Sequence, residues 1–243
     1  MYKGIYIALS GALLKQAQLE VITQNIANAN TMGYKKDGLS FKDYLMPQDV
    51  AGAKPDGRVM SVLSEFRTDY ANGVTVKTGN QLDLAVEGNG FIALEGDRYT
   101  RRGDLRKDRD GYLTTQDGVK VEGAGGPISI PADALSIEID VDGKVSVVQP
   151  GNATPTELDT IKIVDFGPGA SIVKAGNNQF TATGTIETTT SKVSQGHLET
   201  SNVDAIKEMV RMIESMREFE SYQKVIQAFD ETTAKVTDEL GRM

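Results

Sequence analysis

The positions of the prolines constrain the fold of this chain more than any other feature. All seven prolines lie in the middle of the chain, between Pro47 and Pro168, and both ends are free of proline. Proline lacks the backbone N–H and clashes with the preceding turn, so it breaks the interior of an α-helix. The distribution therefore predicts two long ends that can be helical, around a middle of a different kind.

Both ends carry apolar residues at helical spacing, in steps of three and four. The N-terminal stripe, which Gln16 interrupts, consists of Ile5, Leu9, Ala12, Leu13, Leu19, Ile22, Ile26 and Ala29. This helix is expected to end near Asn30, with Gly33 in the left-handed conformation that follows a last turn. Ser201 and Asn202 are predicted to cap a long second helix. Its stripe consists of Ile206, Met209, Ile213, Met216, Phe219, Tyr222, Ile226, Phe229, Thr233, Val236 and Leu240.

The middle of the chain has the two-residue period of β-strands. Apolar residues alternate with polar or small ones at Leu82, Leu84 and Val86, and again at Leu135, Ile137, Ile139 and Val141. Asp-Gly pairs at 110–111, 117–118 and 142–143 predict hairpin turns, the last of them joining residues 135–141 to 144–148. The stretch from Lys35 to Thr68 has little periodicity and is expected to be an extended arm.

These patterns predict an α+β fold in four parts. A helix occupies residues 1–34, an extended connector 35–69, an antiparallel β-rich domain 70–196, and a second helix 197–243. An amphipathic helix alone in water is marginal, because most helical stability comes from packing. The terminal helices are therefore expected to pair in a coiled-coil-like manner, with each other, with other chains, or both.

Composition argues against several classes of function. The formal net charge of −8 disfavours general nucleic-acid binding, and the absence of cysteine excludes disulfides, thiol catalysis and thiolate metal sites. His197 is the only histidine. We therefore expect no enzyme activity, no cofactor and no metal. No stretch is apolar enough to insert into a membrane, and the N-terminus does not read as a cleaved signal peptide.

Four stretches resemble the flagellar rod and hook proteins, and they occur in that family's order. The first is Asn25-Ile26-Ala27-Asn28-Ala29-Asn30-Thr31-Met32-Gly33-Tyr34-Lys35-Lys36, which is similar to the N-terminal signature of the family. The second and third are Leu82–Phe91, and Tyr99–Gly103 with Asp110–Leu113. The fourth is Leu198–Val203, leading into Met209–Glu214.

The resemblance implies a structural subunit of the flagellar basal-body rod. Such a subunit is exported by the flagellar type III apparatus, keeps its N-terminus, and assembles helically in the periplasm with copies of itself and with other rod proteins. Its terminal helices would form the inner core and transmit torque from the motor to the hook. The assembly residues that this implies are Ile5, Leu9, Leu13, Leu19, Ile22, Asn25, Ile26, Asn28, Asn30, Gly33, Tyr34, Ile206, Met209, Ile213, Met216, Phe219, Tyr222, Ile226 and Phe229.

Several interpretations stay open at this point. The chain length and the segment Gly125–Pro131 resemble the proximal-rod branch of the family, with the distal-rod branch as the close alternative. A different class of function, a β-domain binding module on a helical hairpin, also fits the predicted architecture. Tyr34 could anchor in a partner's groove or cover the end of its own helix. The basic residues between Arg98 and Arg109 could form a solvated hairpin face or meet an acidic neighbour.

Overall fold

The computed structural model describes residues 2–45, 59–151, 154–167, 169–188 and 191–240, together with Arg242. The chain forms two compact units, which we call the helical unit and the β unit. The helical unit comprises Met1–Asn28, Lys36–Asp69 and Val203–Met243, and the β unit comprises Ala29–Lys35 and Tyr70–Asn202. The backbone therefore crosses between the units four times, after Asn28, Lys35, Asp69 and Asn202.

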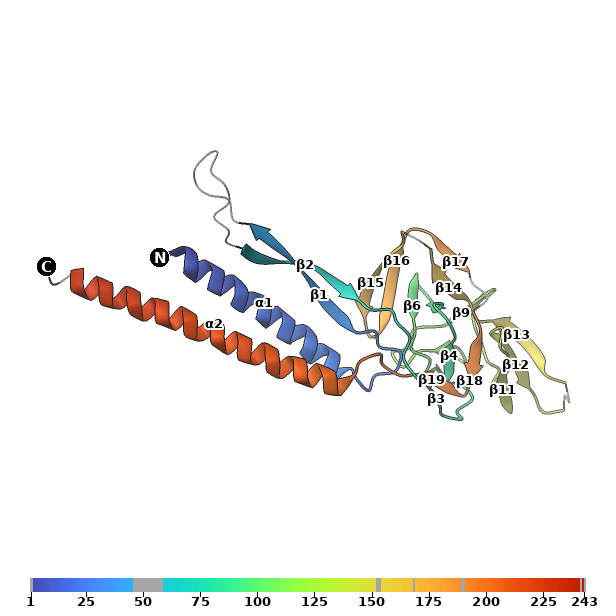
Figure 1. Ribbon diagram of the computed structural model, residues 1–243. Helices are drawn as coiled ribbons and strands as arrows, with labels where there is room; N and C mark the ends of the chain where they lie inside the picture. Colours follow the sequence, from blue (N-terminus) through green and yellow to red (C-terminus); the bar gives the residue numbers. More distant parts are fainter. Residues whose placement is uncertain are drawn as a thin grey trace. The chain divides into compact units, whose positions relative to one another are not determined.

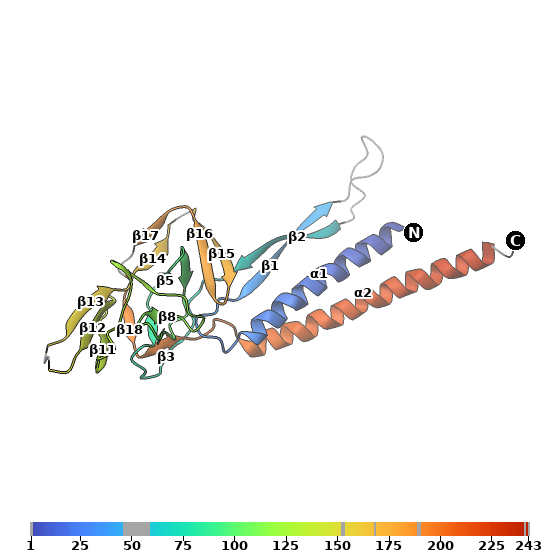
Figure 2. The same ribbon diagram turned by 180° about the vertical axis from the view of Figure 1, so that it is seen from behind.

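Two helices and one β-hairpin make up the helical unit. The helices are α1 (Tyr2–Ala27) and α2 (Ala205–Leu240), and Figures 1 and 2 show them side by side and running in opposite directions. Strands β1 (Asp37–Leu45) and β2 (Val59–Thr68) pair antiparallel, with a register shift between Ser40 and Phe41. Both predicted terminal helices are thus present, whereas the expected extended arm contains a hairpin that its irregular sequence did not predict. The tip of this arm, residues 46–58, lies outside the described residues.

The two helices pack with small residues of α1 against large residues of α2. A Cβ atom on Gly11 would lie 2.6 Å from the Tyr222 ring, and one on Gly4 would lie 3.0 Å from the Phe229 ring. One turn further on, Lys15 forms an ion pair with Glu218. Glycine in α1 therefore makes room for the aromatic side chains, and the helix backbone approaches α2 closely at these positions.

The side chains of α2 that pack within the chain follow a regular spacing. Over residues 205–238, the buried and partly buried positions alternate in steps of three and four; they are Ala205, Glu208, Met212, Ser215, Phe219, Tyr222, Ile226, Phe229 and Thr233. Such spacing keeps one narrow side of a helix facing its neighbour.

Helix α2 begins later than the sequence predicts. Its first-turn amide at Lys207 donates to the Asp204 Oδ1 atom at 3.1 Å, so Asp204 is the N-cap and the prediction of Ser201 or Asn202 is wrong. The Asn202 side chain instead donates to the Ala71 carbonyl oxygen. Hydrogen bonds from Lys207 lower the pKa of the Asp204 carboxyl. The charged cap therefore stabilises the fold above the ordinary carboxyl pKa, and this contribution is lost as the pH falls through the lowered pKa.

The end of α1 is tied to the start of β1 by one asparagine. The Asn25 side chain donates to the Asp37 carbonyl oxygen at 2.8 Å and accepts from the Asp37 amide at 3.0 Å. This two-way bond closes the reversal between helix and hairpin. Gly33, at φ 66°, has the predicted left-handed conformation.

The β unit is antiparallel throughout its described strand pairs. A six-stranded sheet has the order β15 (Ser171–Gly176), β16 (Gln179–Thr183), β6 (Arg98–Thr100), β5 (Phe91–Leu94), β14 (Ile163–Phe166) and β17 (Ile186–Thr188). A three-stranded sheet has the order β11 (Ser136–Ile139), β12 (Lys144–Val148) and β13 (Thr156–Thr160).

Eight short strands form four further pairs in the β unit. They are β18 (Val193–Gln195) with β4 (Leu84–Val86), β19 (His197–Glu199) with β3 (Thr75–Lys77), β7 (Arg106–Lys107) with β8 (Leu113–Thr114), and β10 (Gly126–Pro127) with β9 (Glu122–Gly123). The predicted turns at Gly111, Gly118 and Gly143 have positive φ, and the last joins β11 to β12 as expected.

Strand β5 is buried on both faces and divides the core of the β unit. Ile92 and Leu94 belong to an aliphatic cluster that also contains Leu113 and Val145. Phe91 and Ala93 point to the other face and join an aromatic cluster with Phe180. Because successive side chains of a strand alternate in direction, an uninterrupted apolar run can fill two cores at once.

A buried group of three charges joins segments of the β unit that are far apart in the sequence. The Glu199 carboxylate, 3% exposed, accepts from Lys35 Nζ at 2.7 Å and from Arg101 Nη1 at 3.3 Å. The Gly73 amide donates to the same carboxylate at 2.8 Å. Burial lowers the pKa of Arg101, while the nearby Glu199 charge acts in the opposite direction. The segment that ends at Lys35 is separated in sequence from the rest of the β unit, which begins at Tyr70. The ion pair between Lys35 and Glu199 helps to hold this segment in the unit.

Glu199→Gln is expected to destabilise the β unit by about 3–5 kcal/mol, because it leaves two buried cations without their counter-charge. Chemical denaturation followed by circular dichroism measures the loss. The control is Glu138→Gln, at an exposed carboxylate of strand β11, which should leave the midpoint unchanged. Equal stability of the two variants would show that the charge group does not hold the unit together.

Gly103→Ala is expected to destabilise the β unit by about 1–3 kcal/mol, since overpacking forces the backbone to move. A Cβ atom there would overlap the Leu84 carbonyl oxygen. Gly167→Ala is the matched control, because its Cβ would lie 3.5 Å from the Thr185 side chain, an ordinary contact distance. Thermal unfolding should separate the two variants; a similar midpoint for both would contradict the packing described.

Candidate assembly surface

The outer side of α1 is apolar and exposed. Tyr6 is 64% exposed, and Leu9 and Leu13 are also exposed. The stretch from Gly4 to Leu14 contains no charged side chain. A helix surface without charges is normally covered in the functional state of a protein. We call Tyr6, Leu9 and Leu13 the outer α1 face.

A second exposed apolar surface lies on the first half of α2. It consists of Ile206, Met209, Val210, Ile213 and Met216, and Ile206 is 76% exposed. The residues at 206, 209, 213 and 216 repeat the three-and-four spacing, shifted by one position from the partly buried positions that begin at Ala205. We call these five residues the α2 stripe.

The predicted assembly residues therefore divide into groups. Those that are exposed are Leu9, Leu13, Asn30, Ile206, Met209, Ile213 and Met216. Those that are partly buried are Ile5, Leu19, Ile26, Asn28, Phe219, Tyr222, Ile226 and Phe229. Ile22 and Asn25 are buried in the helical unit, and Gly33 and Tyr34 are buried in the β unit.

The asparagines and Tyr34 make contacts within the chain. Asn25 bonds with Asp37, as described above, and the side chain of Asn28 donates through Nδ2 to the Gln24 carbonyl oxygen at 2.9 Å. Tyr34 is 4% exposed, and Lys174 Nζ lies 4.3 Å from the centre of its ring. Of the two interpretations left open for Tyr34, its burial favours a role inside its own chain.

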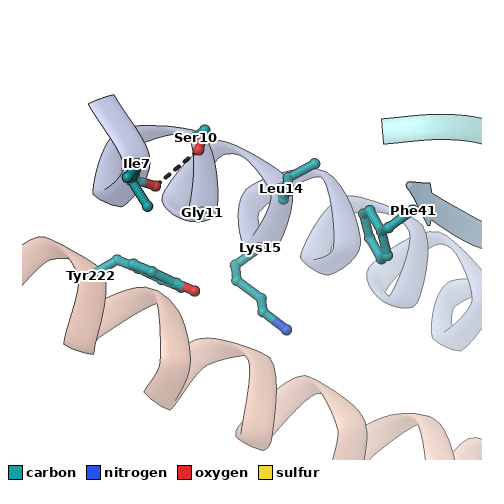
Figure 3. Close-up of a pocket in the computed structure, with 7 residues that line it drawn as sticks. All are labelled: Ile7, Ser10, Gly11, Leu14, Lys15, Phe41 and Tyr222. Atoms are coloured by element: carbon teal, nitrogen blue, oxygen red, sulfur yellow. Dashed lines mark hydrogen bonds between the residues drawn. The ribbon is translucent and has the colours of Figure 1, made fainter. Parts of the chain in front are cut away.

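A cavity of about 300 Å³ lies between the helices and the hairpin of the helical unit. Figure 3 shows Tyr222 of α2 pointing toward Gly11 and Lys15 of α1, with Phe41 of β1 near the other end of the group. Ile7, Ser10 and Leu14 complete the lining. A second cavity of about 190 Å³ lies nearer the base of the helices, with Ile22, Asn25, Glu208 and Arg211 among its lining residues.

The basic cluster of the sequence does not form one surface. Arg101 is buried against Glu199, and the Arg102 guanidinium forms two bonds with Asp104, at 2.7 and 2.9 Å. The hydrogen bond with Asp104 raises the pKa of Arg102. Two of the six basic residues from Arg98 to Arg109 are thus paired with carboxylates of the same chain. This pairing weakens the hypothesis that the six form a surface patch for an acidic neighbour.

Neither a cluster of metal-binding side chains nor a membrane-spanning helix is present among the described residues. They contain no group of three or more His, Cys, Asp or Glu side chains placed to hold a metal ion. None of their helices has the length and apolarity that crossing a membrane requires.

The sequence interpretation missed Tyr6, Val210 and the hairpin residues Phe41 and Phe66, all of which are exposed. The charge-free run around Tyr6 was a usable signal for that residue. Phe41 and Phe66 gave none, because the arm lacks the regular alternation from which a strand is predicted.

Three protein-family models match this chain in sequence order. Residues 5–35 match the flagella basal body rod protein family, residues 85–147 match the D1 domain of the flagellar hook protein FlgE/F/G family, and residues 194–239 match the C-terminal region of flagellar basal body rod FlgEFG proteins. The matches cover nearly all of α1, part of the β unit and nearly all of α2.

Curated relatives match over nearly their whole length. The chain is 35% identical to the flagellar basal-body rod protein FlgG of Bacillus subtilis, with 95% of this chain and 96% of that protein covered. It is 30% identical to FlgF of Caulobacter vibrioides over the full length of both, and 30% identical to FlgF of Escherichia coli with 99% of each covered. The chain therefore belongs to the flagellar basal-body rod protein family, whose members are structural proteins rather than enzymes.

Proposed function

We propose that this chain is a structural subunit of the flagellar basal-body rod, and that its terminal helices form the inner core of the assembly. The observation that carries the proposal is the pair of exposed apolar surfaces, the outer α1 face and the α2 stripe, on a chain that belongs to the rod family. Leaving that much apolar surface in water is unfavourable by about 25 cal/mol per Å². Contacts with neighbouring subunits remove it from water.

We assign one proposed role to each of the four predicted segments. Residues 1–34 and 197–243 pair in a coiled-coil-like manner in the inner core of the rod. Residues 35–69 connect the first helix to the β domain, and residues 70–196 form that outer β domain. The packing of Gly4 and Gly11 against Phe229 and Tyr222 supports helix pairing within one chain. Torque would then be carried by many contacts of this kind and by lateral contacts between subunits.

Export and location belong to the same proposal. We propose that the chain is secreted by the flagellar type III apparatus without cleavage of a signal peptide, and that it works in the periplasmic rod with copies of itself and other rod proteins. The absence of cysteine supports a route on which the chain passes unfolded between compartments of different redox state.

The position along the rod is proposed to be proximal, as in FlgF, with the distal, FlgG-like position as the alternative. Relatives with either name match over almost the whole chain, so the family does not separate the two. The segment Gly125–Pro131 and the chain length support the proximal position. Labelling the protein in intact basal bodies and locating the label by electron microscopy tests the choice.

Ile213→Pro is expected to abolish motility, because proline in the middle of α2 breaks the helix at a cost of roughly 3 kcal/mol or more. The measurements are spreading in soft agar and electron microscopy of basal bodies, which should lack a complete rod. The purified variant should keep the strand signal of its β unit in circular dichroism.

Glu214→Ala serves as the control, since it changes the neighbouring exposed position while alanine preserves the helix. This variant should swim and build rods normally. Normal motility of Ile213→Pro would rule out an essential role for an intact α2 in the rod.

A further inference from the structure

The outer α1 face and the α2 stripe lie at different heights along the helix pair. Gly4 faces Phe229, Gly11 faces Tyr222, and Lys15 pairs with Glu218. In each of these pairs the two residue numbers add up to 233, as expected for antiparallel helices. By the same rule Leu9 lies level with residue 224, whereas Val210 lies level with residue 23. The two surfaces are roughly 14 residues apart along the helices, which is about 20 Å at 1.5 Å per residue.

The two surfaces match each other in spacing and in chemistry. Tyr6, Leu9 and Leu13 are separated by steps of three and four, as are Ile206, Met209 and Ile213. Placed antiparallel, Leu13 meets Ile206, Leu9 meets Met209 and Val210, and Tyr6 meets Ile213. The charge-free stretch around the outer α1 face has no cation or anion to leave unpaired when it is covered. The flexible methionines of the α2 stripe can adapt to the aromatic ring of Tyr6.

We propose that the outer α1 face of one copy packs on the α2 stripe of a second copy, displaced along the helices by about 20 Å. The partner is thus a second copy of this chain, and the contact is heterologous, because it joins two different surfaces. A heterologous contact with a displacement along its axis cannot close into a level ring, so repetition of it winds into an open helix. This inference rests on the proposed function and adds to it the faces that meet and the offset between neighbours.

Cysteine cross-linking tests the contact directly, because the natural chain contains no cysteine. The double variant Leu9→Cys with Val210→Cys should form disulfide-linked dimers and larger multimers when isolated basal bodies are mildly oxidised. A disulfide joins Cα atoms no more than about 7 Å apart. Within one chain the two positions are too far apart, so every such link joins two copies.

Three controls fix the meaning of the result. Each single variant, Leu9→Cys or Val210→Cys, should remain monomeric, because each thiol faces a different surface of the neighbour. The natural side chains at Lys15 and Glu218 form an ion pair within one chain, so any link from the pair Lys15→Cys with Glu218→Cys should be internal and give no multimers. Dimers from a single variant would indicate a symmetric contact and overturn the proposal. Assembled rods of the double variant that give no multimers would overturn it as well.

A charge exchange covers the case in which the cysteine variants fail to assemble. Leu9→Lys alone should reduce incorporation into basal bodies at least tenfold, and adding Val210→Glu should restore most of it. Adding Val210→Lys should not. Equal incorporation with either second substitution would overturn the proposed contact. Failure of the proposed function has a separate signature: the unmodified chain would be missing from purified basal bodies.

Discussion

The Glu199 carboxylate holds together two stretches of chain that the sequence keeps far apart. It accepts hydrogen bonds from Lys35, which follows α1, and from Arg101, which lies inside the β unit, and Glu199 itself lies a few residues before α2. Lys35 Nζ also donates to the Ala71 carbonyl oxygen, and Arg101 Nη1 donates to that of Val86. Transferring a carboxylate and two cations from water into the protein interior is costly, and these further hydrogen bonds offset part of that cost. The segment that follows α1 and the segment that precedes α2 are therefore held together within the β unit.

The helical unit depends on a different principle, the fit of small against large residues. Gly4 and Gly11 leave space for Phe229 and Tyr222, so at these two positions α1 presents no side chain to α2. Three of the large apolar residues of α1, at positions 6, 9 and 13, are exposed. The same division is seen on α2, where Ala205, Glu208 and Ser215 face inward while Ile206, Met209 and Ile213 face outward. In both helices the exposed surface is more apolar than parts of the packed one, which is the reverse of an ordinary monomeric protein.

Local sequence patterns predict some features of this fold and miss others. The helices and the Asp-Gly turns followed from proline placement and period, because those signals are local. The sequence predicts the apolar stripe of α2 as a single surface, although its first part is exposed and its middle part, from Phe219 to Thr233, is partly buried. Glu208 and Ser215 are buried polar residues, and no hydrophobic pattern can point to them. Ser201 and Asn202 also carry suitable oxygens, so the sequence alone does not single out Asp204 as the cap. The Lys35–Glu199 pair joins residues too distant in sequence for any local pattern to connect them.

The make-up of the β unit has a consequence for its independence. The unit comprises Ala29–Lys35 as well as Tyr70–Asn202, so its sequence is not contiguous. A fragment that begins at Tyr70 would lack Lys35 and would leave the buried Glu199 carboxylate with Arg101 as its one remaining cation among these three charges. The β unit therefore cannot be separated intact by a single cut in the chain, because the first residues that complete it come before the hairpin of the helical unit.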